Sequence, residues 1–177
     1  MNSLSRPMPS RRAQASSAGA EMDAAHDPGT PPLRSRHKAR ELALLAMYQC
    51  DISGDGMQRA VGQLCEDNAD GRADLDYFQK VASGAWSRLE ELDRWIAVGA
   101  KNWSLARIST IDRNILRQGI YELLAEPDLP VPVVIHEAIE LSKRYGGDGS
   151  GSFVNGVMDN VAGQIRGTRR SATGGAE

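Results

Sequence analysis

Apolar side chains recur at three- and four-residue intervals in nearly every segment between residues 35 and 166. This spacing places them on one face of an α-helix, whereas a half-buried strand needs strict alternation. The one β-like stretch, residues 131–135, contains Pro132 and follows Pro130, and prolines there favour the first turn of a helix over a strand. The chain is therefore predicted to be all-α, with six or seven helices.

Glycine, proline and polar runs divide the pattern into separate helices. Helices are predicted over about residues 35–53, 57–68, 74–101, 109–125, 132–145 and 152–166. Gly84 marks either a bend in the long third pattern or a tight helix contact. Ser109 and Asp112 have the spacing of a capping box, and the helix that they open is expected to be central because its apolar arc is wide. Either Ser150 or Ser152 is expected to cap the last helix.

The two ends of the chain differ in composition from the middle. Residues 1–33 and 168–177 are rich in small and turn-forming residues without periodicity, so a disordered arm and a disordered tail are predicted around one helical domain over 34–167. No apolar run is long enough to cross a bilayer, and residues 1–32 lack the apolar region of a secretory signal. Cys50 and Cys65 lack a paired spacing. A cytoplasmic protein without membrane contact is expected.

A basic cluster stands at the start of the first predicted helix. Four of the 21 lysines and arginines fall within residues 34–40, although the net charge of the chain is −2. Cations oppose the helix dipole at this end, but they attract phosphate. Arg36, His37, Lys38 and Arg40 are therefore candidate nucleic-acid ligands, and Tyr48 follows on the same side for stacking on a base. The alternatives are a solvated basic helix end, and a tyrosine at the edge of the core with its hydroxyl in water.

A glycine-rich segment, residues 146–151, leads into the last predicted helix. Such a segment can expose several N–H groups to a phosphate, but it has neither a Walker sequence nor a preceding strand. Ser150, Ser152, Phe153 and Asn155 are candidate RNA ligands, because an aromatic residue beside an amide is typical of single-stranded RNA recognition. The alternative places Phe153 in the core with its neighbouring valines.

No constellation of residues indicates catalysis or a bound cofactor. His136, Glu137 and Glu140 imitate the zinc-protease pattern, but glutamate replaces the second histidine and no third ligand is evident. No nucleophile with a matching base stands out elsewhere. We therefore predict no metal, no cofactor and no enzymatic activity.

Three blocks of the sequence resemble the NusB family of transcription antitermination factors. They are Arg-His-Lys-Ala-Arg-Glu with Ala-Met-Tyr-Gln (36–41, 46–49), Ile-Asp-Arg-Asn-Ile-Leu-Arg with Ile-Tyr-Glu-Leu (111–117, 120–123), and a third block formed by residues 133–141, 143–146 and 153–157. The last block is the most specific. The resemblance covers residues 34–167, which are therefore expected to form a NusB-like RNA-binding domain.

The resemblance implies a fold of two small packed helical bundles. It also implies binding to boxA-type single-stranded RNA together with the ribosomal protein NusE, which promotes processive transcription of ribosomal RNA operons. Other Nus factors and RNA polymerase would be engaged indirectly. The RNA ligands implied by the match are Arg36, His37, Lys38, Arg40, Tyr48 and Phe153. Asp112 falls where the family contacts NusE.

Two departures from the family and two alternatives qualify this interpretation. Ser35 and His37 stand where the family usually has arginine, so RNA affinity is expected to be modest and, because histidine is charged only when protonated, pH dependent. His136 stands where members of the family commonly carry asparagine. The alternatives are a stand-alone relative of the helical RNA-binding domain of ribosomal RNA cytosine methyltransferases, and a helical protein-interaction scaffold. Whether the free protein is a monomer or a homodimer stays open.

Overall fold

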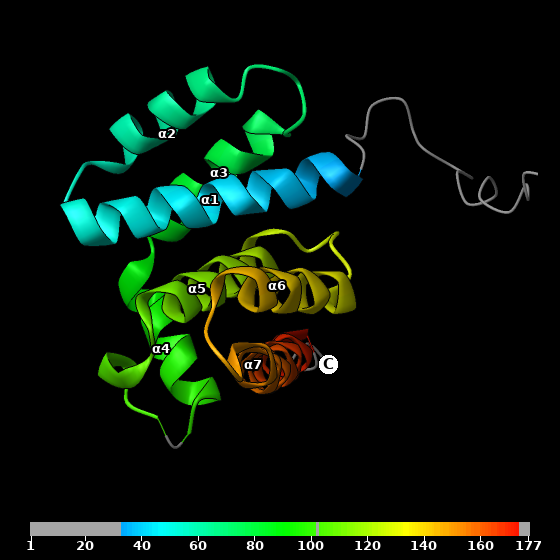
Figure 1. Ribbon diagram of the computed structural model, residues 1–177. Helices are drawn as coiled ribbons and strands as arrows, with labels where there is room; N and C mark the ends of the chain where they lie inside the picture. Colours follow the sequence, from blue (N-terminus) through cyan, green and yellow to red (C-terminus); the bar gives the residue numbers. More distant parts are fainter. Residues whose placement is uncertain (1–32, 102, 174–177) are drawn as a thin grey trace, which may run out of the picture. The chain divides into compact units, whose positions relative to one another are not determined.

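A computed structural model describes residues 33–101 and 103–173 of the chain. The predicted arm, apart from Leu33, and the last four residues lie outside the described residues. The described part is all-helical, as predicted, and contains no strand (Figure 1). Its elements are α1 (Leu33–Ser53), α2 (Met57–Asp67), α3 (Leu75–Trp86), α4 (Leu89–Gly99), the short 3-10 helix η1 (Leu105–Arg107), α5 (Thr110–Ala125), α6 (Val131–Tyr145) and α7 (Ser150–Thr173).

Local sequence explains where several helices begin and end. The side chain of Ser109 accepts a hydrogen bond of 3.1 Å from the backbone N–H of Asp112 at the start of α5, so this predicted cap is confirmed. Asp74 caps α3 in the same way. Pro132 occupies the first turn of α6, where its missing N–H costs nothing. Gly54 follows α1 with a φ of 74°, a conformation that favours glycine.

Two predicted helices differ from the observed ones. The pattern over 74–101 forms two helices, α3 and α4, because a short turn after Trp86 interrupts the helical hydrogen bonding. There the backbone N–H of Arg88 bonds to the carbonyl of Ala85, and the Ser87 hydroxyl donates to the carbonyl of Gly84. The last helix begins at Ser150 rather than at residue 152. It continues through Thr173, so residues 168–173 of the predicted tail are helical.

Helix α5 lies at the centre of the helical packing, as predicted. On one side α1, α2 and α3 pack together, and α1 and α3 contact α5. On the other side α4, α6 and α7 all contact α5 (Figure 1). Ile115, Leu116 and Ile120 of α5 are almost fully buried between these two groups. Within the described residues, no helix combines the length and apolar composition that a membrane span requires.

A buried polar cluster joins α1 to the centre. The Arg40 guanidinium is only 3% exposed, and its Nε donates a 2.8 Å hydrogen bond to Oε1 of Glu122 in α5. The Tyr77 hydroxyl of α3 donates to the same oxygen, and Glu137 of α6 lies 3.5 Å from Arg40. Burial raises the pKa of Tyr77 and the carboxylate of Glu122 raises it further, so the hydroxyl stays protonated as a donor.

This cluster corrects the prediction that Arg40 binds RNA. Although burial alone would lower the pKa of Arg40, Glu122, Tyr77 and Glu137 hold it above its ordinary value, so the side chain remains a cation. That cation is surrounded by partners inside the protein and does not reach the surface. Arg40 therefore positions α1 on α5 and α6.

Gly84 marks a tight helix contact, one of the two roles predicted for it. A Cβ atom at this position would overlap the hydroxyl and ring carbons of Tyr121 in α5. Tyr121 is itself buried, so its ring has little room to move away. The absence of a side chain at Gly84 thus allows α3 to approach α5.

Replacing Gly84 by alanine should destabilise the protein by about 1–3 kcal/mol, since the buried Tyr121 ring must be displaced. Urea unfolding monitored by circular dichroism would measure this loss. Gly62→Ala is the control, because a Cβ there meets open space on α2 and should stabilise the helix by about 0.5–1 kcal/mol. Equal stability of the two variants would show that α3 does not pack on Tyr121 through Gly84.

Replacing Arg40 by methionine should lower the free energy of unfolding by about 3–5 kcal/mol, because Glu122 would remain as a buried charge without its partner. The same unfolding assay tests this expectation. Arg59→Met is the control, since the Arg59 side chain is 80% exposed and its loss should change stability by less than about 0.5 kcal/mol. If Arg40→Met left stability unchanged but weakened RNA binding, the result would show that Arg40 contacts RNA at the surface and contradict its buried structural role.

Candidate nucleic-acid interface

Three predicted ligands on α1, Arg36, His37 and Lys38, are partly exposed, and each lies near a carboxylate. The Arg36 guanidinium lies over the Tyr77 ring, with its Nε 3.8 Å from an oxygen of Asp74. His37 Nδ1 is 2.7 Å from Glu137, and Lys38 Nζ donates a 3.0 Å hydrogen bond to Glu41. Lys38 has the most exposed side chain of the three. The cluster is therefore a charge-paired edge rather than an isolated positive patch.

Glu41 is the centre of this edge and was not among the predicted site residues. Besides Lys38, it accepts hydrogen bonds from the Tyr145 hydroxyl at 3.0 Å and from Arg144 of α6. Burial raises the pKa of Glu41, but the hydrogen bonds from Lys38 and Tyr145 outweigh this effect and lower it. Glu41 therefore stays ionised and holds the end of α6 against α1. The Lys38–Glu41 spacing was visible in the sequence, whereas the contact with α6 was not.

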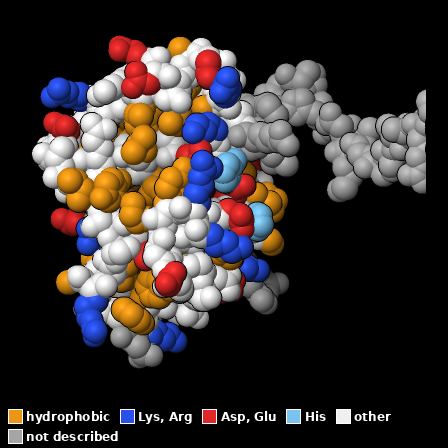
Figure 2. All heavy atoms as spheres, in the orientation of Figure 1, with side chains coloured by type: hydrophobic (Ala, Val, Ile, Leu, Met, Phe, Trp, Pro, Cys, Tyr) orange, Lys and Arg blue, Asp and Glu red, His pale blue; other side chains and the backbone are white. Residues whose placement is uncertain are grey.

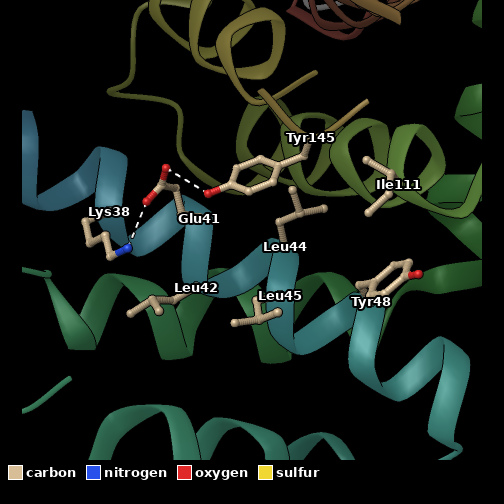
Figure 3. Close-up of a pocket in the computed structure, with 8 residues that line it drawn as sticks. All are labelled: Lys38, Glu41, Leu42, Leu44, Leu45, Tyr48, Ile111 and Tyr145. Carbon is tan, nitrogen blue, oxygen red and sulfur yellow. Dashed lines mark hydrogen bonds and ion pairs between the residues drawn. The ribbon is translucent and has the colours of Figure 1, made fainter. Parts of the chain in front are cut away.

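A small hollow, which we call the α1 pocket, lies beside this edge (Figure 3). Its volume is about 120 Å³, and it is lined by Lys38, Glu41, Leu42, Leu44, Leu45, Tyr48, Ile111 and Tyr145. Tyr48 is 36% exposed, and Figure 3 shows its ring beside this apolar lining, with Lys38 farther along α1. An aromatic surface with a cation at one end suits a planar base and its phosphate.

A second hollow, which we call the loop pocket, lies at the glycine-rich segment. Its volume is about 420 Å³, and it is lined by Trp103, Arg107, Ile108, Ser109, Asp112, Gly147, Asp148, Gly149, Ser150 and Phe153. The Phe153 and Trp103 ring centroids are 5.5 Å apart, with their planes tilted by 57°. Phe153 is partly buried against the core, where Val154 and Val157 are buried, and also faces this pocket. The core alternative for Phe153 thus describes part of its surroundings, and its contact with RNA stays a prediction.

Ser150 is not available to RNA in this structure, which corrects its prediction as an RNA ligand. It is 6% exposed, and its hydroxyl donates a 3.0 Å hydrogen bond to Oδ2 of Asp112. The Ser109 hydroxyl donates to the same oxygen at 2.9 Å. Ser150 and Ser152 lie inside α7, so neither is the residue before the helix that was predicted as its cap. Ser150 instead joins the start of α7 to the start of α5.

The other predicted ligands differ in accessibility. Asp112 is 8% exposed, so a protein partner could meet it only by inserting a side chain into the loop pocket. Ser152 is exposed and Asn155 is half-buried on the first turns of α7. The RNA contacts of Ser152 and Asn155 and the partner contact of Asp112 stay predictions.

Sequence reasoning missed Trp103 and Arg107, which bring a ring and a cation to the loop pocket. Trp103 is 52% exposed, and the Arg107 guanidinium carbon lies 5.7 Å from the centroid of its ring. Their spacing of four residues was a signal, but the prediction ended the preceding helix just before them. His136 is exposed, and Glu140 pairs with Lys143 at 2.8 Å. Among the described residues, no three His, Cys, Asp or Glu side chains gather as a metal site requires.

Comparison with known protein families identifies close sequence relatives. The model of the NusB family matches residues 37–163. A transcription antitermination protein NusB from Geotalea daltonii is 38% identical over 141 residues, which cover 75% of this chain and 97% of that protein. A protein of the same name from Anaeromyxobacter dehalogenans is 40% identical over 136 residues, covering 76% and 95%.

Solved structures agree with the sequence relatives. NusB from T. maritima superposes with a TM-score of 0.65 at 33% identity, covering 75% of this chain and 91% of that one. A structure described as antitermination factors NusB and NusE in complex with dsRNA gives a TM-score of 0.63 at 28% identity, covering 75% and 99%. The chain belongs to the NusB family of transcription antitermination proteins.

Proposed function

We propose that this protein binds boxA-type single-stranded RNA together with NusE and thereby promotes processive transcription of ribosomal RNA operons. It would act in the cytoplasm, without catalysis or a cofactor, and reach other Nus factors and RNA polymerase through the complex. The similar structure that contains NusB, NusE and dsRNA supports a shared RNA-binding role. A single strand is favoured here because bases must be unstacked to contact aromatic side chains.

The observation that carries this proposal is that the two pockets adjoin along the chain and in the fold. Ile111 lines the α1 pocket, and the next residue, Asp112, lines the loop pocket. At the end of α6, Tyr145 lines the α1 pocket, and Gly147, two residues later, lines the loop pocket. Each pocket combines aromatic rings with a cation. One strand can therefore pass over both, with phosphates near the cations and bases on the rings.

The paired state of the cations explains why a protein partner is part of the proposal. Arg36, His37 and Lys38 each lie beside a carboxylate, so their attraction for phosphate is partly cancelled. A chain of net charge −2 has little general affinity for RNA. NusE would supply the additional surface that makes RNA binding tight.

Tyr48→Ala should weaken binding of a boxA-type RNA about 5- to 100-fold in the presence of NusE, because a stacking surface is lost. Lys38→Gln should make the slope of log binding constant against log salt concentration shallower by roughly 0.7, as expected when one phosphate contact with a single strand is lost. Fluorescence anisotropy with boxA-type and scrambled RNA measures both effects. Melting temperature should change little for Tyr48→Ala, since the ring is partly exposed.

Val98→Ala and Arg94→Gln are matched controls, because both side chains are exposed on α4 and line neither pocket. They should leave RNA affinity and its salt dependence unchanged. Equal binding of boxA-type and scrambled RNA, with or without NusE, would refute the proposed function. Selective binding that survives Tyr48→Ala and Lys38→Gln would place the RNA away from the α1 pocket.

A further inference from the structure

Glu41 is a nearly buried carboxylate that holds cations from two helices. Its side chain is only 5% exposed, and its two oxygens have different partners. Oε2 accepts a 3.0 Å hydrogen bond from Nζ of Lys38 in α1, whereas Oε1 accepts from Nη1 of Arg144 in α6 and from the Tyr145 hydroxyl. One carboxylate therefore keeps Lys38 and Arg144 side by side, although two cations alone would repel each other.

The two cations remain open to solvent above this carboxylate. The side chain of Lys38 is 42% exposed and that of Arg144 is 61% exposed. Among the described residues, Glu41 is the only carboxylate that forms an ion pair with either of them. An ammonium group has three N–H donors and a guanidinium group has five, so most of these donors are left for an anion from outside the protein. Figure 2 shows basic, acidic and histidine side chains gathered on this face, beside hydrophobic ones.

The balance of charge distinguishes this pair from the buried Arg40. Arg40 has two acidic partners and is 3% exposed, so an external anion does not reach it. Lys38 and Arg144 share the single carboxylate of Glu41, so two positive charges face one negative charge and the group stays positive. His37 lies 3.7 Å from the same carboxylate and adds to this charge when it is protonated. The group therefore attracts an anion.

The place of this group beside the α1 pocket favours a phosphate as the anion. Lys38, Glu41 and Tyr145 all line this pocket, together with Tyr48 (Figure 3). The Arg144 guanidinium carbon lies 5.3 Å from the centroid of the Tyr145 ring, so Arg144 stands at the rim of the pocket. A base stacked on Tyr48 would bring a phosphate of the same strand to the two cations. A strand of RNA thus accounts for both the charge and the rings.

We propose that Lys38 and Arg144 together hold one backbone phosphate of the RNA, and that Glu41 is the positioning residue that keeps the two cations in place. These three residues are called the α1–α6 clamp. Arg144 is then an RNA ligand contributed by α6, in addition to those predicted on α1. This inference rests on the RNA-binding function proposed above and defines how two helices share one phosphate.

The experiment measures binding of boxA-type RNA in the presence of NusE by fluorescence anisotropy. Lys38→Gln and Arg144→Gln should each weaken binding by about 5- to 30-fold, because a charged hydrogen-bond donor is lost. Arg144→Gln should also make the slope of log binding constant against log salt concentration shallower by roughly 0.7. The double variant should bind at most about 3-fold more weakly than either single variant, because both side chains serve the same phosphate.

Lys143→Gln is the matched control, because it removes a positive charge from the residue next to Arg144. The Lys143 side chain is 62% exposed and pairs with Glu140 at 2.8 Å instead of with Glu41. This variant should leave RNA affinity and its salt dependence nearly unchanged. Equal effects of Lys143→Gln and Arg144→Gln would show general attraction by surface charge and would overturn the clamp.

Glu41→Gln tests the positioning role, since it keeps the shape of the side chain and removes the charge that holds both cations. In this background the losses caused by Lys38→Gln and Arg144→Gln should multiply, because each cation then meets the RNA alone. A residue that only stabilised the fold would lower the melting temperature without changing this coupling. Coupling that persists in the folded Glu41→Gln protein would overturn the positioning role. The variants of Lys38 and Arg144 alter exposed side chains, so they decide the shared phosphate even where Glu41→Gln fails to fold.

The remaining outcomes separate this inference from the proposed function. Failure of the wild-type protein and NusE to select boxA-type RNA would refute the proposed function and this inference with it. Selective binding that Arg144→Gln leaves unchanged, or losses that multiply in the presence of Glu41, would refute the inference alone. Loss of NusE binding by Arg144→Gln in the absence of RNA would assign the two cations to an acidic side chain of the protein partner and also overturn it.

Discussion

The buried guanidinium of Arg40 determines how α1 lies on the rest of the molecule. Its partners come from three other helices, with Tyr77 in α3, Glu122 in α5 and Glu137 in α6. A buried charge is tolerated only where such partners surround it, so rotation or sliding of α1 would leave both Arg40 and Glu122 unpaired. The outer surface of α1 follows from this constraint. With Arg40 inside, Lys38, Leu45 and Tyr48 line the α1 pocket.

The helices could be predicted from the sequence because apolar periodicity and capping residues are local. The role of Arg40 could not, since Glu122 lies 82 residues away and a buried arginine looks like an exposed one on a helical wheel. The same limit applies to Ser150, whose partner Asp112 lies 38 residues away. The break between α3 and α4 was missed because both helices keep the same apolar spacing through it. Long-range polar partners, rather than periodicity, decide which candidate ligands remain at the surface.

Charge pairing within the NusB-family fold has a consequence for RNA recognition. Glu41 and Glu137 orient the cations of α1 and join α1 to α6, but they also weaken the attraction of these cations for phosphate. The affinity of such a surface depends on added contacts, either base stacking or a partner protein. Stacking favours positions where rings are held rigidly, and Tyr48 and Phe153 both pack partly against the protein. An edge of this kind favours selection of a particular RNA over general RNA binding.

Asp112 connects the helical fold with the chemistry of the loop pocket. Its backbone N–H is capped by Ser109, while its carboxylate accepts from both Ser109 and Ser150 and so joins the start of α5 to the start of α7. These hydrogen bonds hold the carboxylate in one orientation, because rotation would break two of them. Ser109 and Ser150 therefore fix the relative positions of the two helix starts through one carboxylate oxygen. The residue whose N–H is capped by Ser109 thus also holds the start of α7 in place, at the wall of the pocket that Trp103 and Phe153 line.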